Sequence, residues 1–209
     1  MSRLLPTPQE LRALPPRAVV ALAVRCCRRV QPLYDLPHEQ HHPASLETPL
    51  CAAEAFARGD AMADASRLIV ALAHAASAAH YAAHAWSCVE PWEHHHRDDP
   101  SANASSSYAR EEARDHRRRA ADEAVAAEQA VTEPGVGGDL AALTAQIART
   151  VTHVTATHVA IKVRPAVASD FEKLRELNPG LGDPLDPSEA GPLGALWPAG
   201  EPAWAGVRG

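Results

Sequence analysis

MADASRLIVALAHAASAAHYAAHAW, residues 62–86, shows the clearest apolar periodicity in this chain. Its apolar side chains recur at alternating steps of three and four residues, which is the spacing of a heptad seam on one face of a helix. Because many of the seam positions hold alanine, the pattern predicts a long helix that a neighbouring helix approaches closely. The seam residues are Met62, Ala65, Ile69, Leu72, Ala76, Ala79, Ala83 and Trp86.

Further helices are expected on both sides of this stretch. Thr7 and Glu10 form a capping box with proline at the first helical position, which marks a helix start. Gly59 suits the C-terminal cap of a helix that ends at Arg58. Residues 108–132 are strongly helix-forming, with an apolar face of Ala113, Ala120, Ala124, Ala127 and Val131. The expected helices before and after the seam cover about residues 8–14, 17–36, 49–58 and 108–132.

Residues 139–164 fit two kinds of secondary structure. Leu140, Ile147 and other apolar residues of this segment follow the spacing of a helix face. Residues 150–163, however, are rich in β-branched side chains and partly alternate like a strand. No second strand-like run is present to pair with them, so we favour a helix. Pro165 is expected to end it, and a capping box at Ser169 opens a short final helix.

The sequence predicts an all-α protein with one main domain. Residues 1–178 are expected to form an antiparallel bundle of about four to five helices. Residues 91–107 are polar and low in complexity, so we expect a flexible loop there, in which the run His94–His96 binds divalent metal only weakly. Residues 179–209 form an irregular tail, because prolines and glycines exclude a long helix.

The tail is too apolar for a plain disordered segment. It contains the candidate interaction residues Leu193, Leu196, Trp197 and Trp204. Pro192 and Pro198 stiffen the chain around Trp197 and reduce the entropy lost when the segment docks. We therefore expect Trp197 to be an anchor that packs on the bundle of the same chain or in a partner.

Charge and composition exclude several classes of protein. The formal net charge of −6 gives no general attraction to nucleic acid or anionic membranes, and neither Arg25 with Arg28–Arg29 nor Arg117–Arg119 has interleaved aromatic residues. No apolar run approaches the roughly 20 residues of a membrane span or the core of a signal peptide. The 4 cysteines form no CxxC pair, so we expect free thiols in a soluble, cytoplasmic protein.

Histidine is the one unusually frequent reactive residue, with 12 copies. His80 and His84 lie one helical turn apart, a spacing that can hold a metal ion, whereas His158 falls on the apolar stripe of its helix. No acidic residue lies near His80 and His84 at metal-helix spacing, and the heptad pattern places both beside the seam or toward solvent. We therefore expect surface histidines at these two positions, a hydrogen-bonded core histidine at 158, no cofactor and no tightly bound metal.

Four segments resemble a family of uncharacterised, alanine-rich helical bacterial proteins from high-GC genomes. They are LRALPPRAVVALAVRCCRRVQPLYDLP (11–37), AEAFARGD (53–60), DFEKLRELN (170–178) and DPSEAGPLGALWPAGEPAW (186–204). The resemblance covers both ends of the chain and includes a GPLGxLWPxG-type tail. It implies that the tail is an integral part of the protein, and it implies no activity.

No motif identifies a catalytic nucleophile or a phosphate-binding loop. The sequence therefore favours a non-enzymatic helical scaffold or protein-interaction module, with an unknown protein partner or with self-association through the alanine-rich seam. The alternative is a metal-binding protein or metal-dependent enzyme that uses His80, His84 and His158. Clustering of these three histidines around one pocket distinguishes the alternative from the scaffold.

Overall fold

The computed structural model describes residues 5–34, 45–60, 64–95, 102–132, 138–153 and 158–202, and the following statements concern these ranges. Regular structure within them is entirely helical, which confirms the predicted all-α class. None of these helices is long and apolar enough to cross a membrane. In chain order the described helices are α1 (Pro8–Arg12), α2 (Pro16–Tyr34), α3 (Glu47–Arg58), α4 (Ala65–His95), α5 (Ala102–Thr132), α6 (Leu140–His153) and α7 (His158–Leu177).

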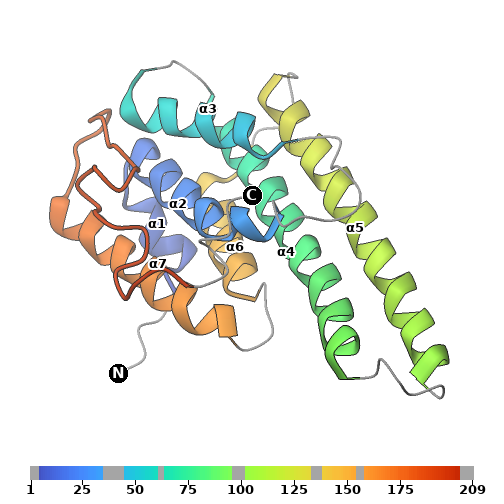
Figure 1. Ribbon diagram of the computed structural model, residues 1–209. Helices are drawn as coiled ribbons and strands as arrows, with labels where there is room; N and C mark the ends of the chain where they lie inside the picture. The colour runs from blue at the N-terminus through green and yellow to red at the C-terminus, as the bar shows by residue number, and fades with distance from the viewer. Residues whose placement is uncertain are drawn as a thin grey trace.

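Helices α4 and α5, with 31 residues each, form a hairpin. They lie side by side and run in opposite directions, and their connected ends point away from the rest of the molecule (Figure 1). Most described residues of the predicted seam of α4 and of the alanine face of α5 are buried, whereas Ala65 and Val131 are half-buried and Met62 and the side chain of Trp86 are not described. Their small side chains allow the two backbones to approach closely. The fully buried members are Ile69, Leu72, Ala76, Ala79 and Ala83 in α4 and Ala113, Ala120, Ala124 and Ala127 in α5.

The connection between these two helices is shorter than the sequence indicated. We expected a loop over residues 91–107, but α4 continues to His95 and α5 begins at Ala102. A polar composition does not distinguish a solvent-exposed helix end from a loop, because extending an existing helix requires only further backbone hydrogen bonds. The part of the expected loop between the two helices lies outside the described residues.

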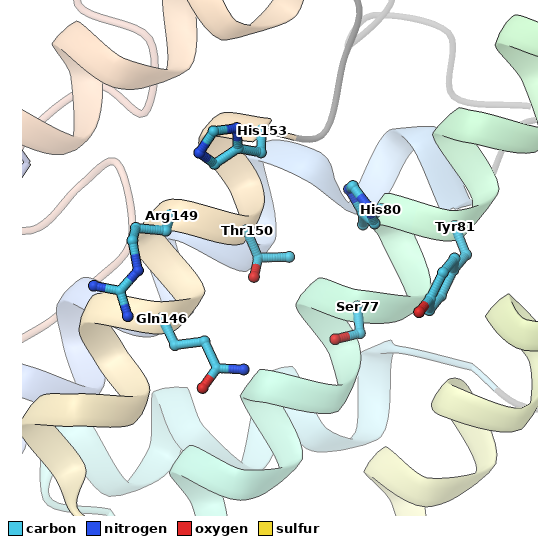
Figure 2. Close-up of a pocket in the computed structure, with 7 residues that line it drawn as sticks. All are labelled: Ser77, His80, Tyr81, Gln146, Arg149, Thr150 and His153. Atoms are coloured by element: carbon cyan, nitrogen blue, oxygen red, sulfur yellow. The ribbon is translucent and has the colours of Figure 1, made fainter.

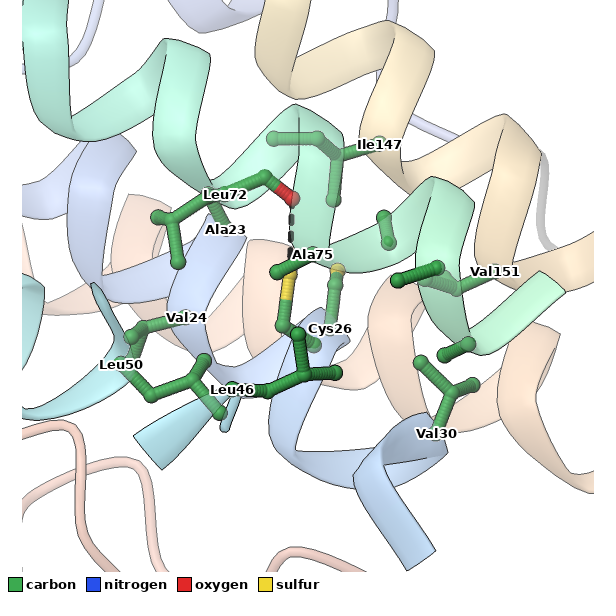
Figure 3. Close-up of a cluster of buried hydrophobic side chains, with 14 of the residues drawn as sticks. Ala23, Val24, Cys26, Val30, Leu46, Leu50, Leu72, Ala75, Ile147 and Val151 are labelled. Carbon is green, nitrogen blue, oxygen red and sulfur yellow. Dashed lines mark hydrogen bonds between the residues drawn. The ribbon is translucent and has the colours of Figure 1, made fainter. Parts of the chain in front are cut away.

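Helix α2 forms the centre of the core and packs against α3, α4, α6 and α7. Figure 3 shows Cys26 of α2 in one apolar cluster with Leu50 of α3, Leu72 of α4 and Ile147 of α6. The thiol of Cys27 donates a hydrogen bond to the backbone carbonyl oxygen of Leu72, with a sulfur–oxygen distance of 3.4 Å. Both thiols are therefore structural parts of the core, as the apolar face of this helix predicted for Cys26.

Helix α7 ends at Leu177, close to where the irregular tail was expected to begin, but it starts well before the predicted boundary. The segment 139–164 forms helices and not a strand where it is described, but it is divided between α6 and α7. Pro165 does not end a helix, because it lies inside α7, and Ser169 is also an interior residue of α7. An internal proline costs about 3 kcal/mol. Val163 and Val167 on either side are fully buried, and burial of each side chain stabilises the fold by about 1.5–3 kcal/mol. Packing of these two residues therefore outweighs the cost of the proline.

The tail after α7 is irregular but packs against the helices (Figure 1). The backbone N–H of Leu185 donates to the carbonyl oxygen of Ala57 at the end of α3, at 2.8 Å. Leu193 is fully buried beside residues of α2 and α7 in a second apolar cluster. The tail therefore covers part of the core that the helices leave open.

Two arginines of α2 bind the tail from inside the core. Arg25 and Arg29 are fully buried and both donate to the carboxylate of Asp170 in α7. Both arginines also donate to the tail, although Nη1 of Arg29 is buried without a partner in the described structure, and neither guanidinium lies on the surface as a nucleic-acid contact would require. The accepting backbone carbonyls are those of Pro187, Ser188, Gly194 and Ala195 for Arg25 and that of Leu196 for Arg29.

Candidate metal site

Five side chains with metal-ligating atoms gather where α4 and α5 face each other. His80, His84 and Cys88 follow at intervals of four residues on α4, which places them one turn apart on a single helix face. Glu112 and His116 have the same spacing on α5. Because the two helices lie alongside each other, the two rows of side chains meet. We name these five residues the His–Cys–Glu cluster.

The ligand atoms of the cluster lie close together. The ring centroids of His80 and His84 are 4.6 Å apart, and those of His84 and His116 are 5.4 Å apart. The Nε2 atom of His116 lies 3.9 Å from Oε1 of Glu112. One ligand atom each from Cys88, Glu112 and His116 lies within 4.8 Å of the other two. Donors about 2.0–2.3 Å from a tetrahedral zinc ion are separated by roughly 3.3–3.8 Å, so these side chains hold one ion after closing in by about 1 Å or less.

Two imidazole nitrogens of the cluster lack a partner. The Nδ1 atoms of His80 and His116 are buried and accept or donate no hydrogen bond within the described parts of the chain. A buried polar atom without a partner costs about 1–3 kcal/mol. Such atoms point to a binding partner that the protein itself does not supply.

The electrostatic environment keeps His80 and His84 neutral. Burial, and after it the neighbouring rings of His84 and His116, lower the pKa of His80 to about 4. Burial and His116 also hold the pKa of His84 below its usual value. A neutral imidazole is the form that ligates a metal ion. Burial and the carboxylate of Glu112 raise the pKa of the Cys88 thiol, so metal binding has to displace the thiol proton.

The sequence identified only part of this cluster. His80 and His84 were metal candidates, but we expected them to be solvated, whereas both are half-buried and contact another histidine. The third candidate, His158, is the first residue of α7, and its side chain lies outside the described part of the structure. The structure therefore brings two of the three candidates together and adds three residues that the sequence interpretation did not select.

Those three residues could have been found from spacing. Cys88 extends the four-residue interval of His80 and His84 by one more turn, and Glu112 and His116 repeat it on the next helix. The objection to a metal site was the lack of an acidic residue near His80 and His84 in sequence. Glu112 supplies that carboxylate from the facing helix.

The predicted interaction residues of the tail face the chain itself. Leu193 is fully buried and Trp197 is 8% exposed. Leu196 is half-buried and packs against the main apolar cluster. Trp204 lies outside the described residues. The described anchors of the tail thus contact the helices of their own bundle and leave little apolar surface for another protein.

Comparisons with protein-family models, with curated proteins and with solved structures found no match.

Proposed function

We propose that this protein binds a zinc-like divalent metal ion in its α4–α5 hairpin, with Cys88, Glu112 and His116 as ligands. The observation that carries the proposal is the convergence of these three donors, from two helices, within 4.8 Å of one another. Two of the three residues come from α5 and one from α4. An ion at this point therefore links the two longest helices of the described structure.

The chemistry of the donors selects the kind of ion. A thiolate and imidazoles favour borderline-soft ions such as zinc over magnesium and calcium, which prefer oxygen ligands. The single carboxylate of Glu112 is also a normal zinc ligand. We expect magnesium to compete poorly for the site.

His84 determines whether the coordination shell is closed. Its ring lies between those of His80 and His116 in the series of ring contacts. With His84 as fourth ligand the site has the four protein ligands of a structural zinc site. With three protein ligands, the fourth position remains open to water, as in catalytic zinc sites. We favour the closed arrangement, in which the imidazole of His84, whose pKa burial and His116 hold below its usual value, turns toward the three donors that already converge.

A closed site makes the ion part of the fold. Metal that binds only the folded chain adds its binding free energy to stability. The hairpin interface consists largely of alanine, which buries little apolar area per residue. A zinc ion between α4 and α5 would therefore supply stability that the alanine interface does not.

The helical scaffold predicted from the sequence remains the second candidate function. The alanine-rich seam that the sequence suggested for self-association is buried within the same chain, where α4 packs against α2, α5 and α6. The described tail anchors are likewise used internally. The metal site is therefore the function that the geometry supports better.

A competition titration tests the proposal. Tag-free protein, with His94, His95 and His96 replaced by glutamine to remove weak background binding, is titrated with zinc against a chromogenic chelator. We expect one zinc per chain, a loss of affinity of at least about tenfold in Cys88→Ser and His116→Gln, and unchanged affinity in Cys51→Ser. Cys51 is an exposed thiol of α3 and serves as the matched control. Equal zinc affinity in the parent protein and its three variants, or no bound zinc, would contradict the proposal.

A further inference from the structure

A pocket of about 380 Å³ that several polar side chains line lies between α4 and α6, next to the His–Cys–Glu cluster. Figure 2 shows Ser77 of α4 and Gln146 of α6 facing each other across the space between the helices, with Thr150 one turn further along α6. His80 also lines the pocket, so this residue borders both the pocket and the cluster. The volume falls in the range of about 300–1,000 Å³ that small-molecule sites occupy.

The side chains around the pocket have unused hydrogen-bonding capacity. Ser77, Gln146 and Thr150 make no side-chain hydrogen bond to any residue that the structure describes. The buried Nδ1 atom of His80 is also without a partner. A pocket that presents several unpaired polar groups to one volume can orient a polar ligand through several bonds.

The charge at the pocket is positive. Arg149 and His153 of α6 lie at its exposed rim, and no acidic residue is among the described residues that line it. Arg149 forms no ion pair within the described ranges. A guanidinium that no carboxylate neutralises attracts anions and can hold a carboxylate or phosphoryl group through two parallel hydrogen bonds.

We propose that this pocket binds a small anion that carries carboxylate or phosphoryl oxygens. Arg149 holds the anionic group at the rim, and the hydroxyl and amide groups of Ser77, Gln146 and Thr150 bind the rest of the ligand. The inference concerns a site separate from the metal ligands Cys88, Glu112 and His116. It therefore goes beyond the proposed metal binding and does not depend on it.

Binding of two probes to metal-free protein tests this inference. Inorganic phosphate represents the phosphoryl arm and malonate the carboxylate arm, and both are titrated calorimetrically at constant ionic strength set with sodium chloride. We expect saturable binding of at least one probe, which identifies the preferred oxygen group. Arg149→Gln should weaken this binding at least about tenfold, because it removes the charge and keeps most of the side-chain volume. Thr150→Val, which removes one hydroxyl at nearly constant shape, should weaken it less.

Arg164→Gln is the matched control, since Arg164 is an exposed arginine of α7 away from the pocket lining. Its binding isotherms should match those of the unaltered protein. Circular dichroism confirms that each variant remains folded. Absence of saturable binding of both probes would overturn the inference. Binding that is the same in Arg149→Gln and Thr150→Val would also overturn it. The same titrations are repeated with zinc-loaded protein. Binding that appears only with zinc and is unaffected by Arg149→Gln would also contradict the inference, because the anion would then bind the metal.

Discussion

The carboxylate of Asp170 accepts a hydrogen bond from Nε of Arg25 at 2.8 Å, and the exposed fractions of these two side chains are 0% and 1%. Arg29 donates to the same carboxylate from one turn further along α2, at 2.5 Å. One negative charge thus faces two positive charges inside the protein. Backbone carbonyls of the tail accept the remaining hydrogen bonds of Arg25. The three charged residues therefore join α2, α7 and the tail.

We predict that Asp170→Asn strongly destabilises the protein. Removing one partner of a buried ion pair leaves uncompensated charge, which costs about 3–5 kcal/mol. Urea unfolding should show a loss of this size. Glu172→Gln on the same helix should cost well under 1 kcal/mol, because the Glu172 side chain is 45% exposed and lies 3.7 Å from its partner Arg175. Equal stabilities of the two variants would contradict this account of the core.

We predict that Trp197→Ala lowers the free energy of unfolding by about 3 kcal/mol or more, as for other buried tryptophans. Trp197 is 8% exposed, and the guanidinium carbon of Arg29 lies 5.9 Å from the centre of its ring. Leu181→Ala, in the same tail but at a position that is 88% exposed, is the control and should be nearly neutral. Thermal or urea unfolding measures both. A Trp197→Ala protein as stable as the control would show that the tail does not support the core.

The sequence predicted helices α4 and α5 well because their signal is a long, regular periodicity. Most of the predicted apolar positions that the structure describes are buried, since burial of one face is what produces the pattern. The boundaries around Pro165 were wrong because local propensity was outweighed by the burial of Val163 and Val167. The ion pairs of Asp170 could not be predicted, because they join residues far apart in the sequence.

We predict that Glu47→Gln reduces the loss of stability in acid. The hydrogen bond from Arg28 is the main cause that lowers the pKa of Glu47 to about 2, from a usual 4.5. A carboxyl whose pKa is lower in the folded state stabilises the fold above the unfolded-state pKa. This contribution is lost as the pH falls from about 5 toward 2. Melting temperatures measured at pH 6 and pH 3 should therefore differ less in Glu47→Gln than in the unaltered protein.

The exposed Glu176→Gln is the control for this pH dependence, because Glu176 forms no ion pair with a described residue. Its melting temperatures should follow those of the unaltered protein. If Glu47→Gln and Glu176→Gln show the same change with pH, the Arg28–Glu47 pair does not contribute as proposed.

We predict that zinc protects one thiol from alkylation. Cys26 and Cys27 are fully buried, and burial raises the pKa of Cys26 to about 12, so both should react only on unfolding. Cys51 and Cys88 are accessible in the metal-free protein and should be alkylated by iodoacetamide. Zinc should slow the reaction of Cys88 and leave that of Cys51 unchanged, as mass spectrometry of the peptides would show. Equal rates at Cys88 with and without zinc would contradict ligation by its thiolate.

The candidate metal site was only partly predictable from the sequence. His80 and His84 were visible because their spacing is local to one helix. Glu112 and His116 belong to a different helix, and only the antiparallel pairing of α4 with α5 brings them to the same point. Cys88 shares the spacing of the histidines, but it lay close to the expected loop and was not considered as a ligand.

X-ray absorption spectroscopy of the zinc-loaded protein is the decisive test of the metal site, because it reports which atoms surround the ion. With the run His94–His96 replaced by glutamine, we predict one sulfur ligand at about 2.3 Å together with nitrogen or oxygen ligands at about 2.0–2.1 Å. The sulfur contribution should disappear in Cys88→Ser and persist in Cys51→Ser. A zinc shell of nitrogen and oxygen alone, in the protein that retains Cys88 and Cys51, would contradict a metal site at Cys88, Glu112 and His116.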